Sequence, residues 1–139
     1  MQVYKSKYKK IDFHQAESVM EVTWLPQTAD MSAQEYQEEM LNYIEIARKY
    51  KPLYALPNTA ELFFTITPEI QQWMNAQIFP VFAQIGMRAA AFVVSQDIFA
   101  QLSIEQTMEE EVGQRFQSRY FVNTEEAMNW LQSFSKNLN

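Results

Sequence analysis

The architecture of the chain follows from residues 19–56, which read VMEVTWLPQTADMSAQEYQEEMLNYIEIARKYKPLYAL. The segment opens with β-branched and aromatic residues (19–25) that predict a strand, and it closes with a short apolar run (53–56) that predicts another. Between them Ser32 and Glu35, three residues apart, form a capping box that predicts the start of a helix. A strand, a helix and a strand in succession predict parallel neighbours joined by a right-handed crossover.

The same reasoning extends to both ends of the chain. Toward the N-terminus a strand at 8–14 makes a hairpin with 19–25 and turns at residues 15–18. Toward the C-terminus the patterns predict a helix at 67–85, a strand at 88–95, a helix at 97–112, a strand at 115–122 and a helix at 123–138. Pro80 lies inside the first of these helices, so a kink or a helix in two pieces is expected there.

The predicted fold is therefore α/β, with the element order ββαβαβαβα. It has a mixed five-stranded sheet, an antiparallel N-terminal hairpin, mostly parallel strands after it, and four helices. The chain has 139 residues and a mass of 16.4 kDa, and no Gly/Ser-rich linker or internal repeat divides it. We expect a single domain over residues 1–139.

Composition argues against several kinds of chemistry. The chain has no cysteine and one histidine, His14, which we interpret as a surface histidine rather than a proton shuttle. Its two glycines, Gly86 and Gly113, lie too far apart for a phosphate-binding loop. We expect no metal site and no cofactor, and we do not expect an enzyme.

Charge and hydropathy bear on partners and location. The net charge is −6, from 11 basic and 17 acidic residues, which does not suit nucleic acid. Lys5, Lys7, Lys9 and Lys10 crowd near the N-terminus, and we interpret them as lysines on the solvent side and edge of an exposed strand. No apolar run approaches the roughly 20 residues of a membrane span. A cytoplasmic location is expected.

Two segments carry a resemblance to a known family. One is the strand VMEVTWL with the long helix SAQEYQEEMLNYIEIARKY that follows it. The other is RYFVNTEEAMNWLQSF, an aromatic strand, a polar cap, then Ala127 and the Trp130–Leu131 pair on the last helix. With this element order, the chain resembles the STAS domain, the fold of anti-sigma-factor antagonists, and most closely the divergent single-domain STAS-like proteins of bacteria. Its sheet is also similar to the CRAL-TRIO lipid-transfer fold.

The resemblance implies a regulatory role in signalling. In that family a serine in an Asp-Ser-Ser context, at the start of the helix after the third strand, is phosphorylated and controls partner binding. The corresponding stretch here reads FFTITPEI (63–70), which lacks the Asp-Ser pair and places Ile66 where the serine would be. Thr65 and Thr67 bracket that position and are the candidate phosphoacceptors or partner contacts, although Thr67 is also explained as a helix cap.

Other candidate site residues follow from topology and from the high aromatic content, 14%. Polar residues beyond the carboxyl ends of the predicted parallel strands are candidates for a small ligand or partner site, with loop and cap roles as the alternative. They are Asn58, Glu61, Ser95 and Asp97. The aromatic candidates for a pocket or a partner surface, with core as the alternative, are Phe63, Phe64 and Phe79.

Three functional hypotheses remain open. The first is a non-enzymatic regulatory or protein-interaction module, in which a protein partner or self-association is expected. The second is a carrier or sensor of a small apolar, lipid-like ligand held among the aromatic residues. The third is an enzyme of the hydrolase type that uses Glu61 and Asp97, which requires both carboxylates to be held near one substrate.

Overall fold

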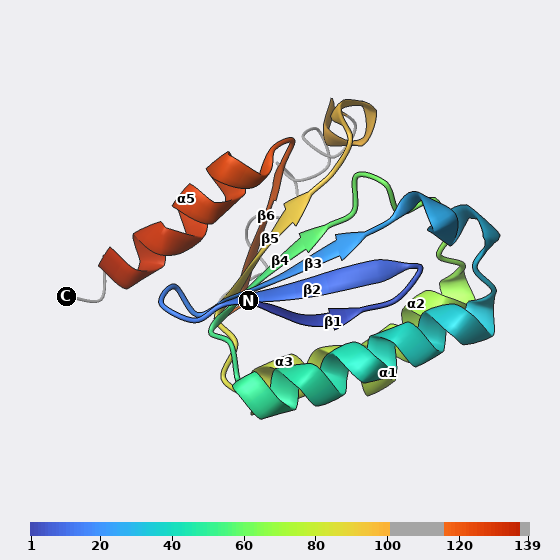
Figure 1. Cartoon of the computed structure of the whole chain (residues 1–139), viewed down its shortest axis with the longest axis horizontal. Helices are drawn as coiled ribbons and strands as arrows, with labels where there is room; N and C mark the ends of the chain where they lie inside the picture. Colours follow the sequence, from blue (N-terminus) through green and yellow to red (C-terminus); the bar gives the residue numbers. More distant parts are fainter. Residues whose placement is uncertain (101–115, 137–139) are drawn as a thin grey trace.

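The computed structural model describes residues 1–100 and 116–136 of the chain (Figure 1). The strands are β1 (Gln2–Lys5), β2 (Lys9–His14), β3 (Val19–Trp24), β4 (Tyr54–Asn58), β5 (Ala89–Val93) and β6 (Gln117–Phe121). The helices are the 3-10 helix η1 (Pro26–Asp30), α1 (Ala33–Tyr50), α2 (Pro68–Gln77), α3 (Phe79–Gln84) and α5 (Thr124–Lys136), and residues 96–100 after β5 are also helical.

All six strands form one sheet in the order β1-β2-β3-β4-β5-β6. The strands β1, β2 and β3 are antiparallel, and β3 through β6 are parallel. The α/β class, the mixed sheet and the N-terminal hairpin are thus confirmed. The predicted number of five strands is wrong, because the prediction did not include β1. This strand pairs with β2, and the register of the pair shifts between Gln2 and Tyr4. A four-residue strand with this irregularity shows no clean alternation of apolar and polar residues.

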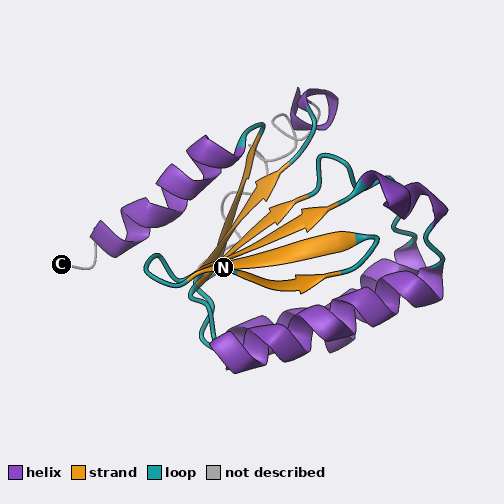
Figure 2. Ribbon diagram, in the orientation of Figure 1, coloured by secondary structure: helices purple, strands orange, loops and turns teal. Residues whose placement is uncertain are grey.

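The sheet is covered differently on its two faces (Figure 2). The face toward α1, α2 and α3, called here the α1 face, carries the larger core. Its strand residues are Ile11, Phe13, Met20, Val22 and Trp24. The opposite face, called the α5 face, is covered by α5 over β4, β5 and β6. Its core residues include Val19, Tyr54, Leu56, Ala91, Phe121 and Leu131.

Local signals explain where the helices begin and end. Ser32 accepts a hydrogen bond from the Glu35 amide, and the Glu35 carboxylate accepts one from the Ser32 amide, which confirms the capping box of α1. The helix predicted around Pro80 is in two pieces, as expected, with Pro80 in the first turn of α3. Gly86 follows α3 with a φ of +86°, the left-handed backbone that favours glycine.

The structure corrects three details. The strand predicted to close before Pro57 runs through it to Asn58. In the helix predicted at 97–112, the apolar spacing predicts that Ile98 faces the core, but this residue is 48% exposed. Lys9, expected on the solvent side, is completely buried on the α1 face, because in β2 it shares that face with Ile11 and Phe13. The remainder of the predicted helix 97–112, with Gly113, lies outside the described residues.

Candidate functional site

The first candidate site is the β4–α2 loop, residues 59–67, which follows the carboxyl end of β4. Its beginning is fixed to the sheet, because the Thr59 amide and hydroxyl both donate to the Val93 carbonyl, at 2.7 and 3.0 Å. Asn58 accepts from the Ala60 amide at 3.1 Å, and the Leu62 amide donates to the Thr59 carbonyl at 3.1 Å. The loop thus continues the sheet as a defined turn.

Thr28 of η1 fixes the middle of the loop. This side chain is fully buried, and its hydroxyl accepts a hydrogen bond from the Phe63 amide at 2.9 Å. The single proton of this hydroxyl is within reach of two acceptors, the Leu25 carbonyl at 2.8 Å and the Glu61 carbonyl at 3.2 Å. One buried hydroxyl therefore joins η1 to the loop and anchors the backbone amide of Phe63.

The loop directs its two phenylalanines to opposite environments. Phe64 packs inward, with its ring 4.8 Å from that of Tyr36, which in turn lies 5.6 Å from the ring of Trp24. Burial in this stack raises the pKa of Tyr36 to about 12. Phe63 points outward and is 56% exposed, and Ile66, three residues later in the same loop, is 38% exposed. The loop thus presents apolar side chains to solvent from a fixed backbone.

The two threonines of the loop differ in what they do. The Thr67 hydroxyl accepts a hydrogen bond from the Ile70 amide and caps α2, as the sequence predicts. Thr65 is exposed and directly precedes Ile66 in the sequence. Of the two candidate phosphoacceptors, Thr65 is the one whose hydroxyl is not the N-cap of a helix.

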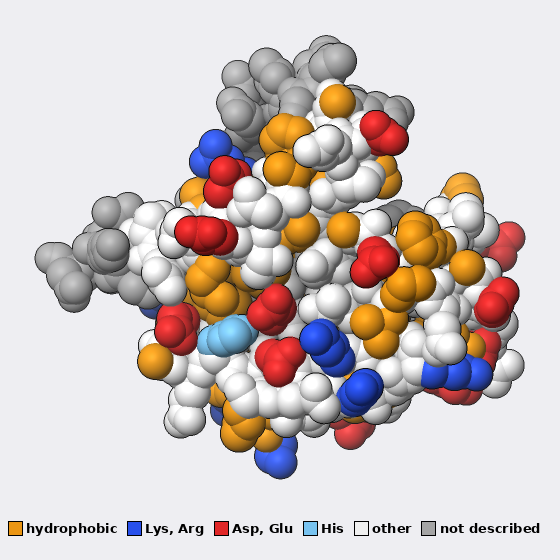
Figure 3. Space-filling view, turned by 45° about the horizontal axis from the view of Figure 1, so that its top comes forward, with side chains coloured by type: hydrophobic (Ala, Val, Ile, Leu, Met, Phe, Trp, Pro, Cys, Tyr) orange, Lys and Arg blue, Asp and Glu red, His pale blue; other side chains and the backbone are white. Residues whose placement is uncertain are grey.

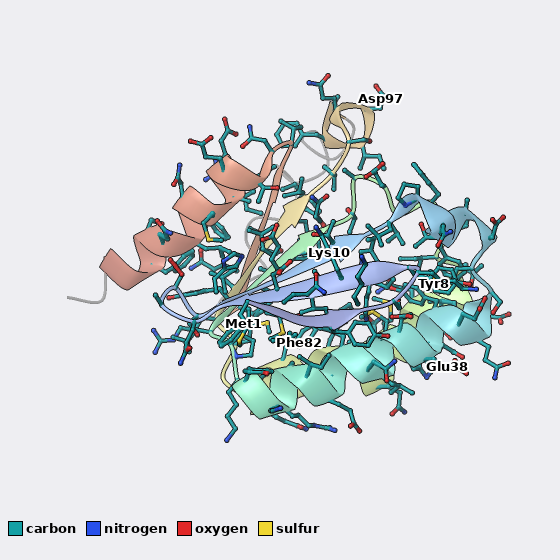
Figure 4. All side chains as sticks on the ribbon, viewed as in Figure 1. Met1, Tyr8, Lys10, Glu38, Phe82 and Asp97 are labelled. Carbon is teal, nitrogen blue, oxygen red and sulfur yellow. The ribbon has the colours of Figure 1, made fainter. Side chains whose placement is uncertain are left out.

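Of the remaining predicted candidates, Ser95 and Asp97 follow β5, whose Val93 is the register partner of Asn58 at the end of β4. Ser95 caps the helix at 96–100 by accepting from the Ile98 amide at 3.3 Å, and Asp97 is exposed on that helix (Figure 4). Glu61 is exposed on the β4–α2 loop. Phe79 follows α2, whereas Phe63 precedes it, so about 15 Å of helix separates the two.

The ring contacts of Phe82 show how part of the interior is filled. The ring of Phe82 lies 5.9 Å from that of Tyr43 and 6.0 Å from that of Phe79. With Phe64, Phe82 therefore belongs to the core between α1 and the α2–α3 segment. The prediction of an apolar-ligand pocket among these rings stays a prediction.

A second feature is the polar half of the α5 face. Over β2 and β3 this face carries Lys10, Asp12, His14, Glu21 and Thr23, and Figure 3 shows the single histidine among carboxylates and lysines. His14 Nε2 lies 2.8 Å from Glu21 Oε1. Asp12 and Glu21 are direct partners across the two strands. Among residues 1–100 and 116–136, no three acidic or histidine side chains are placed to hold a metal ion.

A third feature is Lys9, whose buried ammonium lies between β2 and α1. It donates to the Glu39 carbonyl and lies 3.7 Å from Glu39 Oε1. Three rings surround it, those of Trp24 at 5.0 Å and of Tyr4 and Tyr43 at 5.6 Å each. Burial lowers the pKa of Lys9 to about 8, against the opposing effect of Glu39.

Comparison of the chain with models of known protein families, with curated proteins and with solved structures gives no match. In the part of the chain that the structure describes, no helix has the length and apolar character needed to cross a membrane. The function is therefore inferred from the geometry of the loop and of the two faces of the sheet.

Proposed function

We propose that this protein is a non-enzymatic regulatory module of the STAS-like type, acting in the bacterial cytoplasm, and that it binds a protein partner through the β4–α2 loop. The observation that carries the proposal is the position of Phe63. Its side chain is 56% exposed, while its amide is bound to the buried hydroxyl of Thr28.

Rigidity and exposure together favour binding. An apolar side chain on a backbone that is already ordered loses little conformational entropy when a partner covers it. Burying a phenylalanine side chain contributes roughly 1.5–3 kcal/mol, and aromatic anchors of this kind dominate many protein interfaces. Ile66 adds a second apolar contact from the same loop.

The loop precedes a helix that follows a parallel strand, as the resemblance expects, although that strand is β4, the fourth of the chain and not the third. The stretch FFTITPEI includes the loop's last five residues and corresponds to the region of the regulated serine in STAS-like proteins. Within the proposal, Thr65 is the residue at which phosphorylation would add charge beside Phe63 and Ile66. A charge of nearly −2 next to an apolar contact disfavours an apolar partner surface.

The experiment is a quantitative capture from an extract of the source cells, with the full chain immobilised. We compare wild type with Phe63→Ser and with the matched control Leu41→Ser, which changes an apolar side chain that is 48% exposed on α1. We expect a protein that wild type and Leu41→Ser retain equally and that Phe63→Ser retains at least tenfold less. Equal retention by all three would contradict the proposal.

The same variants test self-association. Sedimentation velocity of wild type and Phe63→Ser shows whether the partner is a second copy of the chain. Loss of a dimer in Phe63→Ser, but not in Leu41→Ser, would assign the loop to a homodimer. A monomer in every case would leave a different protein as the expected partner.

A further inference from the structure

Lys9 begins β2 and points toward α1, whereas its neighbour Lys10 lies on the other side of the sheet (Figure 4). No part of the Lys9 side chain reaches solvent. Lysine is rarely buried in this way, because an ammonium ion loses its hydration when it is transferred from water to the protein interior. The residues around it must replace that hydration.

The surrounding residues come from three elements and form what we call the ammonium cage: Tyr4 of β1, Trp24 of β3, and Glu39 and Tyr43 of α1. Three ring centroids lie 5.0 to 5.6 Å from Nζ, within the range of cation–π attraction. Glu39 supplies a backbone carbonyl that accepts a hydrogen bond and a carboxylate oxygen at 3.7 Å. Aromatic faces around a cation are an arrangement that proteins use to bind quaternary ammonium ligands.

The cage is itself held in position by polar contacts. The Tyr4 hydroxyl donates to Glu39 Oε1 at 3.0 Å and accepts from the Asn42 side-chain amide at 3.3 Å. These bonds orient the Glu39 carboxylate and keep the Tyr4 ring beside the ammonium. The cage thus joins the β1–β2 hairpin to α1 at a single buried charge.

We propose that Tyr4, Trp24, Glu39 and Tyr43 form a specific binding site for a primary alkylammonium ion, which the folded chain fills with its own Lys9. At pH 7 the ammonium of Lys9 joins the hairpin to α1 through its hydrogen bond to the Glu39 carbonyl, while the burial of its charge costs stability. The ammonium cage is independent of the proposed role of the β4–α2 loop.

The protonation states of the facing groups leave Lys9 charged at pH 7. The pKa of Lys9 is lowered to about 8, so the ammonium form predominates at pH 7. Burial raises the pKa of both Tyr4 and Tyr43, so both phenols stay neutral there. Among the described groups that contact the ammonium, Glu39 is therefore the one acidic partner.

The test removes the internal ligand and replaces it with a free one. Lys9→Ala deletes a fragment that corresponds to propylammonium. We measure the thermal unfolding midpoint of the variant at pH 7 with propylammonium chloride, with sodium chloride at equal ionic strength, and with propan-1-ol. We expect propylammonium to raise the midpoint in a saturable way, by about 4 °C at ten times its half-saturating concentration.

Three controls make the result specific. Wild type, whose cage is filled, should show no saturable shift with propylammonium. Propan-1-ol should not raise the midpoint of Lys9→Ala. The double variant Lys9→Ala with Glu39→Gln should need at least about tenfold more propylammonium, because a charge-assisted contact is lost. Equal shifts with propylammonium and propan-1-ol, or no shift with either, would overturn the proposal.

A measurement on the wild-type chain covers the case in which Lys9→Ala does not fold. In a ¹⁵N-labelled sample, the Nζ resonance of Lys9, assigned as the signal absent from Lys9→Met, reports its charge directly. We expect an ammonium signal with slowed proton exchange at pH 7, and a lower titration midpoint in Glu39→Gln. A neutral amine at pH 7 would overturn the proposal.

Discussion

The replacement Lys9→Met gives the sharpest stability test, because methionine keeps an unbranched apolar chain and removes the charge. Burial lowers the pKa of Lys9 from its ordinary value of 10.5 to about 8 in the folded chain. Between these values the unfolded chain binds more protons than the folded chain. The free energy of unfolding of wild type therefore rises as the pH increases from 8 to 10.5.

The size of the change in the free energy of unfolding follows from the pKa shift of Lys9. One pKa unit corresponds to 1.36 kcal/mol, so the charge on Lys9 contributes a rise of roughly 3 kcal/mol across the window. The variant lacks this contribution. The raised pKa values of Tyr4, Tyr36 and Tyr43 affect stability at high pH, but they act on both proteins. The difference between wild type and variant therefore isolates Lys9.

The assay is urea unfolding followed by tryptophan fluorescence at several pH values from 7 to 10.5. We expect the wild-type free energy of unfolding to gain roughly 3 kcal/mol relative to Lys9→Met over this range. The difference should be nearly constant below about pH 7.5, where Lys9 is charged in both states. Parallel curves over the whole range would show that the ammonium is not buried and would refute the reasoning.

Three other substitutions test the loop anchor and two helix ends by the same urea assay. Thr28→Val removes the hydroxyl bound to the Phe63 amide and should cost roughly 1–3 kcal/mol, while Thr28→Ser should retain most of the stability; equal losses in both would contradict the anchor. Ser32→Ala removes the capping box of α1 and should cost about 1 kcal/mol, and an unchanged midpoint would count against it. Gly86→Ala meets no atom within 4 Å, so its expected loss of about 1 kcal/mol comes from the positive φ alone, and a neutral result would contradict that reason.

Features with a local cause were predictable from the sequence. The N-terminal hairpin, the capping box at Ser32 and the division of the helix at Pro80 each depend on residues a few positions apart. The alternation of strands and helices then indicated the parallel part of the sheet, since crossovers have a fixed hand. The strand β1 was missed because four residues with a broken register carry too little periodicity.

Lys9 shows where residue type misleads. The alternation with Ile11 and Phe13 places it on the buried face, but lysine alone predicts solvent. The groups that make its burial possible lie far away in the chain, with Glu39 thirty residues later. A local pattern cannot reveal such a partner, although a lysine in phase with core residues of a strand is a signal to look for one.

For a similar reason, the sequence revealed only part of the candidate site. The sequence indicates Phe63 and Phe64 alike as candidates for a pocket or partner surface, with core as the alternative; Phe63 is exposed, whereas Phe64 packs against the core. Its anchor was missed, because Thr28 lies in a segment without apolar periodicity and its partner is 35 residues away. The opposite directions of Phe63 and Phe64 follow from that anchor and from the stack on Tyr36.

The central claim is that Phe63 makes the contact with a protein partner, and photocrosslinking in living source cells tests it most directly. A photoreactive benzoylphenylalanine is placed at position 63 and, in a parallel strain, at position 41 as the exposed control. Irradiation should give one discrete adduct from position 63 and none from position 41. No adduct from position 63, or the same adduct from both positions, would contradict the account.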